Sequence, residues 1–394
     1  MNLDPLRRRA LVNGGIAAAV TLVVGLGVVA AVTADGEEAT PTAAPTASPT
    51  TPAPTCTPRF EMAQSAAPGE LSSWLSGVTV LSPIEAWAVG ASGLPDLPFG
   101  VVIERWDGTA WTAEEGPNPG SQINELLDVD AAEPNDVWAV GRTASGFGDR
   151  PLVLRFDGTA WFEMGLPEEV TGVLSGIAAI APDDVWAVGY TGNPAISLER
   201  SLVLHWDGQL WAVVELGAAD GNGRSALQDV EAIATDDVWA VGHLRNRPLI
   251  VRFDGEGWTR SPTEESGSAN GVAPLTPTDA WAVGAPIQRF DGTTWTQVDG
   301  LDEGVELLDA AAVSPADVWA VGTAATNRED VVQGVVARFD GSEWSAVEGP
   351  GIPGSDTLSA IDAIGDGTVF AVGHRDGAAG RRTLAILGVT CPTG

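Results

Sequence analysis

A five-residue phrase recurs seven times along this chain, and few folds accommodate such a repeat. It reads AWAVG or VWAVG in six copies and VFAVG in the last, and its aromatic residues are Trp87, Trp138, Trp186, Trp239, Trp281, Trp319 and Phe370. A second phrase, of the form RFDGxxW with small variations, follows each of the first six copies and ends at Trp111, Trp161, Trp211, Trp258, Trp295 and Trp344. The aromatic positions lie 38 to 53 residues apart, a period that corresponds to one supersecondary unit per repeat.

Each repeat divides into four short strands. A small-residue run such as ELLDVDAA at 125–132 precedes the VWAVG strand, and a third strand such as PLVLRF at 151–156 leads through Asp-Gly into a strand that opens with tryptophan. Asp-Gly between apolar runs indicates a hairpin turn. VWAVG is apolar on both faces, as in a sheet packed between two others, and no 3.6-residue helical period is present. We therefore predict an all-β, seven-bladed β-propeller of four-stranded blades.

The seventh repeat is incomplete, because the chain ends soon after VFAVG with no Asp-Gly turn and no final tryptophan strand. Phe60-Glu61-Met62 resembles Phe162-Glu163-Met164 of the second repeat. We therefore expect residues near 58–64 to supply the missing outer strand, so that the ring closes without an open seam. Cys56 and Cys391 flank this junction, and the two cysteines of an exported chain are expected to form a disulfide. Two free thiols are the alternative.

The N-terminal segment predicts export. Residues 1–9 form a basic terminus with Arg7, Arg8 and Arg9, and the apolar residues 10–32 are long enough, roughly 34 Å as a helix, to cross a bilayer. The arginines place that terminus in the cytoplasm, so we expect a single-pass signal anchor with residues 56–394 as an extracellular propeller. Cleavage after Ala34 is the alternative and would give a secreted protein. Residues 33–55, rich in Ala, Thr and Pro, predict a disordered, extended linker.

The charge of the chain excludes two classes of partner. It has 53 acidic residues against 20 basic ones, a net charge of −33. A nucleic-acid-binding protein must offer cations to phosphates, so no nucleic acid is expected. Docking on anionic lipid is disfavoured for the same reason, and membrane contact should be limited to the N-terminal helix. The charge is interpreted as a solubility device for an exported monomer, or alternatively as a surface for a cation or a basic partner.

The repeats resemble those of kelch-like or galactose-oxidase-like β-propellers, in a WAVG…FDGxxW variant of the sort found in exported bacterial proteins. The resemblance covers residues 57–394 and implies the propeller fold. The chain lacks the diglycine of kelch repeats, and it has one Tyr and three His. The copper chemistry of galactose oxidase therefore does not carry over, and we expect no cofactor.

The repeat also separates scaffold residues from candidate site residues. The tryptophans, the Asp before VW and the Arg before Phe-Asp recur, so we assign them to the scaffold, with the Arg and Asp as partners. Unrepeated cations gather in the loops after VWAVG, on a face that the acidic connections between blades share. We predict a binding face with Arg142, Arg200, His243, Arg245, Arg247, Arg328, His374 and Arg375. The alternative is that these are solvated loop charges that pair locally.

Two further signals are weaker. The segment 220–223 (DGNG) has oxygen ligands at alternate positions, as a calcium loop does, but the rest of a calcium pattern is missing. No G-x-S-x-G motif occurs, and we assign no catalytic residue and no metal site.

We expect a non-enzymatic recognition or scaffold module for glycan, cell-wall polymer or an extracellular protein. The alternative is an extracellular hydrolase or lyase with its site at the central channel, which a cluster of unrepeated His, Tyr, Asp and Arg at the channel mouth would favour. A third possibility is an envelope assembly scaffold without a small ligand. The fold alone does not choose among them.

Overall fold

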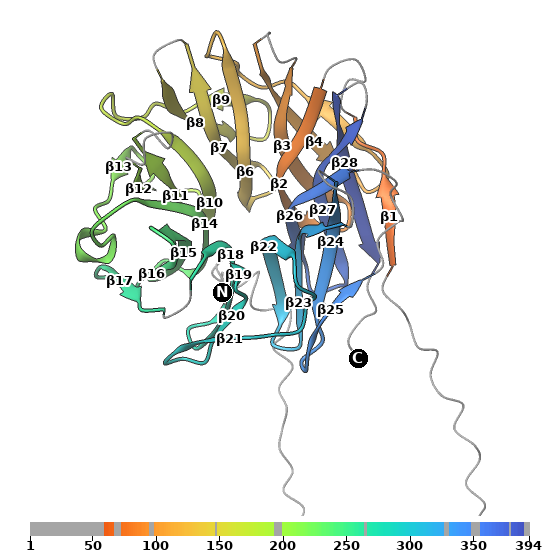
Figure 1. Ribbon diagram of the computed structural model, residues 1–394. Helices are drawn as coiled ribbons and strands as arrows, with labels where there is room; N and C mark the ends of the chain where they lie inside the picture. The colour runs from red at the N-terminus through yellow and green to blue at the C-terminus, as the bar shows by residue number, and fades with distance from the viewer. Residues whose placement is uncertain are drawn as a thin grey trace, which may run out of the picture.

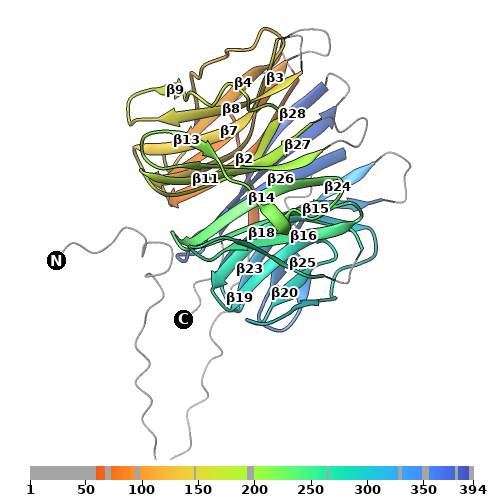
Figure 2. The same cartoon turned by 90° about the vertical axis from the view of Figure 1, so that its left-hand side faces the viewer.

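Seven four-stranded antiparallel sheets form the protein and follow one another around a ring in chain order (Figures 1 and 2). The computed structural model describes residues 59–66, 72–93, 98–145, 148–192, 199–263, 266–326, 331–347, 355–377 and 380–389. The predicted membrane helix at 10–32, the linker at 33–55, Cys56, Cys391 and Arg328 lie outside these ranges. Within them, no helix is long and apolar enough to cross a membrane. The predicted seven-bladed architecture is confirmed.

Each blade contributes one strand to each of four rings. The innermost strands are β2 (Ser72–Ser82), β6 (Ile123–Glu133), β10 (Val173–Ala181), β14 (Ser225–Ala234), β18 (Ser268–Thr276), β22 (Val305–Ser314) and β26 (Ser355–Ala363). The second strands, which carry the VWAVG phrase, are β3 (Glu85–Gly93), β7 (Asp136–Ala144), β11 (Asp184–Thr191), β15 (Asp237–Leu244), β19 (Asp279–Ala285), β23 (Asp317–Ala325) and β27 (Thr368–Gly377).

The third strands are β4 (Gly100–Trp106), β8 (Asp149–Phe156), β12 (Arg200–Trp206), β16 (Arg247–Phe253), β20 (Gln288–Phe290), β24 (Val332–Phe339) and β28 (Gly380–Val389). The outer strands are β5 (Trp111–Glu114), β9 (Trp161–Glu163), β13 (Trp211–Val213), β17 (Trp258–Ser261), β21 (Trp295–Gln297), β25 (Trp344–Val347) and, for blade 7, β1 (Arg59–Ala63). One short 3₁₀ helix, η3 (Gly217–Ala219), joins blades 3 and 4.

The ring closes where β1, drawn in orange, lies beside the blue β28 (Figure 1). This is the strand that the incomplete seventh repeat lacks. The register differs from the one that the Phe-Glu-Met similarity predicts. Phe60 faces Gly388 and takes the place of Trp161, not of Phe162. Phe60 is 6% exposed, whereas Phe162 is 37% exposed, so the similarity is offset by one residue and the alignment based on it is wrong.

Aromatic rings fill the space between blades. The aromatic residue of each second strand packs edge to face on the outer-strand tryptophan of the following blade in six of the seven junctions, at centroid distances of 5.3–5.8 Å. In the junction between blades 6 and 7, Trp319 meets Phe60 instead, at 5.7 Å. Such pairs contribute about 0.5–1.5 kcal/mol beyond the area they bury. The recurrent aromatics therefore join neighbouring sheets as well as fill one.

The Asp-Gly turns are four-residue loops with a fixed internal bonding pattern. In blade 2, Asp157 Oδ1 accepts hydrogen bonds from the backbone N–H groups of Thr159 and Ala160, at 2.9 and 3.1 Å. Gly158 adopts a φ of 91°, which favours glycine. The Thr159 hydroxyl also donates to Asp157 Oδ1. This bond and the two backbone bonds lower the pKa of Asp157. The pattern explains why Asp and Gly recur together.

The inner strands carry a feature that the small-residue runs did not predict. At one equivalent position the blades hold, in order, Gly77, Asp128, Gly176, Asp229, Gly271, Asp309 and Ala360. A Cβ on the three glycines would lie 2.6–2.9 Å from the Cα of the aspartate in the following blade, so only glycine fits there.

The three aspartates in turn bind the blade that follows each of them. Asp128, Asp229 and Asp309 accept hydrogen bonds of 2.7–2.9 Å from the N–H groups of Ile177, Val272 and Ile361. Burial raises the pKa of all three, to about 6 for Asp229, and mutual repulsion adds to the rise for Asp128 and Asp309. Buried carboxyl groups thus connect neighbouring inner strands, and their burial opposes ionisation.

The ring has two distinct faces. The loop face carries the loops between second and third strands and the connections between blades. The turn face carries the turns between first and second strands and the Asp-Gly loops. Arg59 and Thr368 both pair with Val389, and Thr368 begins the second strand of its blade. The described chain therefore enters the ring at the turn face.

Candidate functional site

The recurrent Arg and Asp pair on the turn face, which confirms their assignment as partners. An arginine from the third strand contacts the carboxylate that begins the second strand, at 2.6–2.9 Å, in five blades: Arg105–Glu85, Arg155–Asp136, Arg252–Asp237, Arg289–Asp279 and Arg338–Asp317. Each guanidinium also covers the second-strand tryptophan of its own blade, 4.5–5.1 Å from the ring centroid. Because the set repeats from blade to blade, it belongs to the scaffold.

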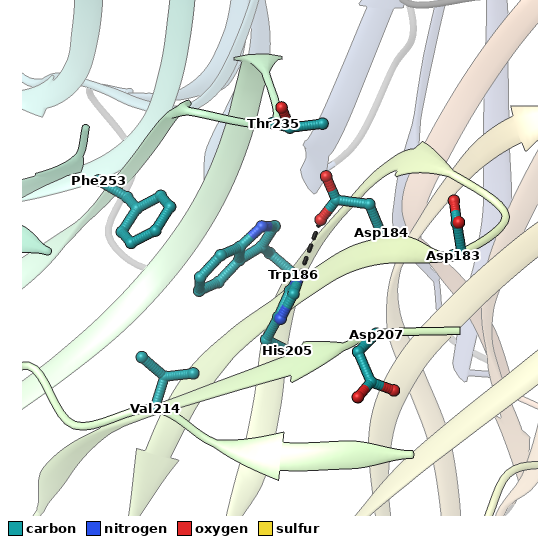
Figure 3. A pocket seen from close by; sticks show the side chains of 8 residues that line it. All are labelled: Asp183, Asp184, Trp186, His205, Asp207, Val214, Thr235 and Phe253. Carbon is teal, nitrogen blue, oxygen red and sulfur yellow. Dashed lines mark hydrogen bonds and ion pairs between the residues drawn. The ribbon is translucent and has the colours of Figure 1, made fainter. Parts of the chain in front are cut away.

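Blade 3 departs from this pattern. His205 replaces the arginine, bonds to Asp184 Oδ1 at 2.8 Å and lies 4.2 Å from the Trp186 ring (Figure 3). A pocket of about 540 Å³ opens beside the pair, lined by Asp183, Asp184, Trp186, His205, Asp207, Val214, Thr235 and Phe253.

The loop face is different, because there the blades diverge. The residue that follows the VWAVG phrase changes around the ring: Ala91, Arg142, Tyr190, His243, Ala285, Thr323 and His374. It lies where each second strand reaches the loop face, next to the start of the inner strand. We call this part of the loop face, beside the inner strands, the mouth of the ring. At the position after VWAVG, blades 2, 3, 4 and 7 carry large polar side chains, and blades 1, 5 and 6 carry small ones.

An ion-pair network occupies the mouth over blades 1 and 2. The Trp74 indole Nε1 donates to Glu125 Oε1 at 3.1 Å, and Arg142 Nε donates to Glu125 Oε2 at 2.8 Å. Arg142 Nη1 also reaches Asp149 Oδ2 at 3.5 Å. The Glu125 side chain is 11% exposed, and the two donors satisfy both of its oxygens. Trp74 packs edge to face on Phe99 at 5.4 Å.

The network continues over blades 3 and 4. Tyr190 interacts electrostatically with Arg142, Asp149 and Glu199, and burial raises the pKa of its hydroxyl. Glu199 is 3% exposed and forms an ion pair with Arg224, whose Nη2 lies 3.0 Å from Glu199 Oε1. Arg224 and Glu199 are the charged groups that act on His243. We call Trp74, Glu125, Arg142, Asp149, Tyr190, Glu199, Arg224 and His243 the mouth network.

His243 and His374 share an electrostatic environment that favours the neutral imidazole. Burial lowers the pKa of both, and an arginine adds to the effect in each case, Arg224 for His243 and Arg381 for His374. Nε2 of His243 is buried without a hydrogen-bond partner in the described part of the chain. Arg381 lies over the Trp74 ring at 5.7 Å, so blade 7 approaches the same arc of the mouth.

The structure separates the predicted site residues that it describes into three groups. Arg142 and His243 belong to the mouth network, and His374 and Arg375 lie on β27 beside Thr357 and Asp356 of the inner strand. Arg200, Arg245 and Arg247 are exposed, and the last two line a shallow depression of about 820 Å³ with Arg260. Arg328 lies outside the described residues.

The calcium-like segment uses its oxygens within the protein. Asp220 Oδ1 accepts a hydrogen bond from the Ser225 hydroxyl at 2.6 Å, and the Asn222 carbonyl accepts one from Arg245 Nη2 at 2.6 Å. Among the residues that the structure describes, no three His, Cys, Asp or Glu side chains form a group that could hold a metal ion. The Asp220 carboxylate oxygen and the Asn222 carbonyl oxygen are thus engaged within the protein.

Six members of the network were not predicted as site residues from the sequence: Trp74, Glu125, Asp149, Tyr190, Glu199 and Arg224. Two signals could have found them. Trp74 is the one tryptophan outside the repeated phrases, and Tyr190 is the one tyrosine of the chain. Both are departures from the repeat that a comparison of equivalent positions would have shown.

The comparisons with known proteins support the fold. No protein-family model matches the chain, and no curated protein is significantly similar to it. Among solved structures, one titled "YCF48 bound to D1 peptide" is 14% identical, covers 85% of this chain and 98% of its own, and has a TM-score of 0.55. A streptogramin B lyase is also 14% identical, covers 84% and 97%, and has a TM-score of 0.58.

A GH74 xyloglucanase from Xanthomonas campestris is 15% identical, covers 81% of this chain and 53% of its own, and has a TM-score of 0.53. Identities this low establish the propeller fold alone. They do not confirm membership of the kelch-like or galactose-oxidase-like group. The chain is a seven-bladed β-propeller, and its function must be argued from its surface.

Proposed function

We propose that this protein is a non-enzymatic recognition module that binds a polypeptide partner at the mouth of its loop face. The observation that carries the proposal is the mouth network. Its members are unrepeated polar and aromatic residues on four successive blades, at a place where blades 5 and 6 carry small residues. The scaffold does not require them, because other blades fold without them.

The residue types of the network suit a polypeptide ligand. Trp, Tyr and Arg are the side chains that most often dominate binding energy at protein interfaces. Trp74, Tyr190 and Arg142 provide one of each along a single arc. The buried carboxylates of Glu125 and Glu199 hold the neighbouring Arg142 and Arg224 in place.

The orientation of the ring favours the same face. The described chain enters at the turn face, so an anchor at residues 10–32 would be attached to the side of the ring opposite the mouth. The mouth would then be open to partners outside the cell. The similar structures include YCF48 bound to a D1 peptide, which adds weight to a polypeptide over a glycan or a wall polymer.

A comparison of ligand classes tests the proposal. Soluble residues 56–394 would be applied in parallel to a random peptide library, a glycan array and immobilised cell-wall polymer. Enrichment of specific peptides that is lost in Arg142→Ala supports the proposal. Arg150→Ala is the matched control, because Arg150 lies on the same blade but is exposed outside the network. Selective binding of a glycan or wall polymer alone would overturn it.

An enzyme remains the second candidate, because the mouth does bring unrepeated Tyr, His, Asp and Arg residues together. Tyr190 lies near Arg142 and Asp149. His243 stays neutral near pH 7 because burial and Arg224 lower its pKa, and a neutral imidazole can act as a general base. Turnover of a glycoside or an ester panel that disappears in His243→Gln would establish a hydrolase or lyase in place of a binder.

A further inference from the structure

The pocket of blade 3 lies on the turn face, away from the mouth network, and is bounded by blades 3 and 4 (Figure 3). Asp184, Trp186 and His205 come from blade 3, and Thr235 and Phe253 from blade 4. Asp183 and Asp207 add two further carboxylates at its edge. The repeat offers an internal comparison, because the equivalent space of five other blades holds a side chain.

In those blades the space holds a guanidinium, and Arg252 of blade 4 shows its bonding in full. Nε and Nη2 donate to the two carboxylate oxygens of Asp237 at 2.7 and 2.8 Å. Nη1 donates to the carbonyl oxygen of Pro277 in the next blade at 3.1 Å. The group lies 4.5 Å from the centroid of Trp239.

The phenylalanine of the next blade forms the far wall in other copies. Arg105 lies 6.0 Å from the Phe156 ring and Arg289 lies 5.7 Å from the Phe339 ring. Taken together, these copies show four elements. The carboxylate and the aromatic face from the same blade occur in all five, a phenylalanine of the next blade lies beside Arg105 and Arg289, and Arg252 adds the bond to a carbonyl of the next blade.

Blade 3 has all four elements but not the guanidinium. Asp184 is the carboxylate, and Trp186 is the aromatic ring, which His205 partly covers at 4.2 Å between centroids. Phe253 is the phenylalanine, with its ring centroid 5.0 Å from that of Trp186. Thr235 takes the position of Pro277, two residues before the strand-initial aspartate in each case. His205 bonds to Oδ1 of Asp184 with a single nitrogen, so Oδ2 and the Thr235 carbonyl lack the donors that Arg252 supplies one blade later.

We propose that this pocket binds the guanidinium group of an arginine on a partner polypeptide, which would dock on the turn face. A guanidinium is planar and has several N–H donors, so it could donate to both Asp184 Oδ2 and the Thr235 carbonyl while it lies against an aromatic ring. A lysine ammonium is a compact charge without this planar geometry. The three carboxylates at the pocket and the net charge of −33 attract a cation. This site is independent of the mouth proposed above.

The test uses ¹⁵N-labelled residues 56–394 and follows the indole N–H signal of Trp186, assigned with Trp186→Phe. The probe is N-acetyl-arginine amide. The matched controls are N-acetyl-citrulline amide, which has nearly the same shape without the charge, and N-acetyl-lysine amide. We expect a saturable shift with the arginine derivative, no saturable shift with the citrulline derivative and a weaker response to lysine.

His205→Arg supplies the decisive variant, because it fills the pocket from within using the residue that five other blades already carry. We expect it to fold and to abolish the Trp186 response. A response that persists in His205→Arg, an equal response to citrulline, or no saturable response in the wild-type protein would each overturn the proposal.

Discussion

Replacing Phe60 by alanine tests how the ring closes. Phe60 is 6% exposed, packs edge to face on Trp319 at 5.7 Å and belongs to the cluster that includes Val336 and Ile386. Truncation of a buried phenylalanine costs about 3–5 kcal/mol. Because β1 is the outermost strand of its blade and can relax, we expect about 3 kcal/mol for Phe60→Ala.

Phe162→Ala is the matched control. Phe162 lies on an outer strand of blade 2 and is 37% exposed, so its truncation should cost less than about 1 kcal/mol. The two residues would be equivalent if the Phe-Glu-Met similarity gave the true register. Guanidinium unfolding of residues 56–394 measures both changes, and hydrogen exchange of β28 shows whether the closing sheet opens first. Equal costs for the two variants would refute the register described above.

Three further predictions concern stability. Burial raises the pKa of Asp229 from about 4 to about 6, so the stability that its neutral form contributes is lost as the pH rises through that range. Turn hydrogen bonds lower the pKa of Asp291 to about 2, so its contribution is present above about pH 4 and is lost as the pH falls below it. The melting temperature should therefore peak between about pH 4 and 5, and Asp229→Asn should reduce the gain between pH 7 and 5. Arg155→Ala should cost about 3 kcal/mol in unfolding, because it leaves the buried Asp136 carboxylate unpaired. Mass spectrometry should find Cys56 and Cys391 joined, and reduction should lower stability by up to about 5 kcal/mol.

The blade architecture could be predicted because the repeat is a packing requirement. Each second-strand aromatic must meet an aromatic of the next blade, as Trp138 meets Trp211. A residue under that constraint recurs in every copy, and the number of copies equals the number of blades. The same argument identified Arg155 and Asp136 as scaffold partners.

The inner-strand aspartates escaped prediction because an Asp in an apolar strand has no periodic signal of its own. Asp128 and Asp309 are informative only beside Gly77 and Gly271, with which they alternate around the ring. The alternation arises across blades, where a glycine makes room for the aspartate backbone of its neighbour. The register of Phe60 was also predicted wrongly, because it was based on the identity of three residues with Phe162-Glu163-Met164. The structure instead places Phe60 where its ring is buried between blades.

The candidate site could be predicted only in part. The loop face and two members of the network, Arg142 and His243, followed from the unrepeated cations after VWAVG. These two were expected in loops, but they lie near the ends of β7 and β15, because the second strands continue past the phrase. Tyr190 and Glu199 were not predicted, because neither is a cation and their proximity to Arg142 and Arg224 depends on how blades 2, 3 and 4 curve around the axis. Sequence position places a residue on a face, but contacts between blades require the closed ring.

The most direct test of the proposed function is a peptide library selected on immobilised residues 56–394 and then counter-selected on two variants. Tyr190→Ala alters the mouth, and His205→Arg alters the opposite face. We predict a family of peptides that binds the wild-type protein and His205→Arg but not Tyr190→Ala. If no peptides are enriched, or if those enriched bind Tyr190→Ala as well as the wild type, the mouth is not a polypeptide-binding site.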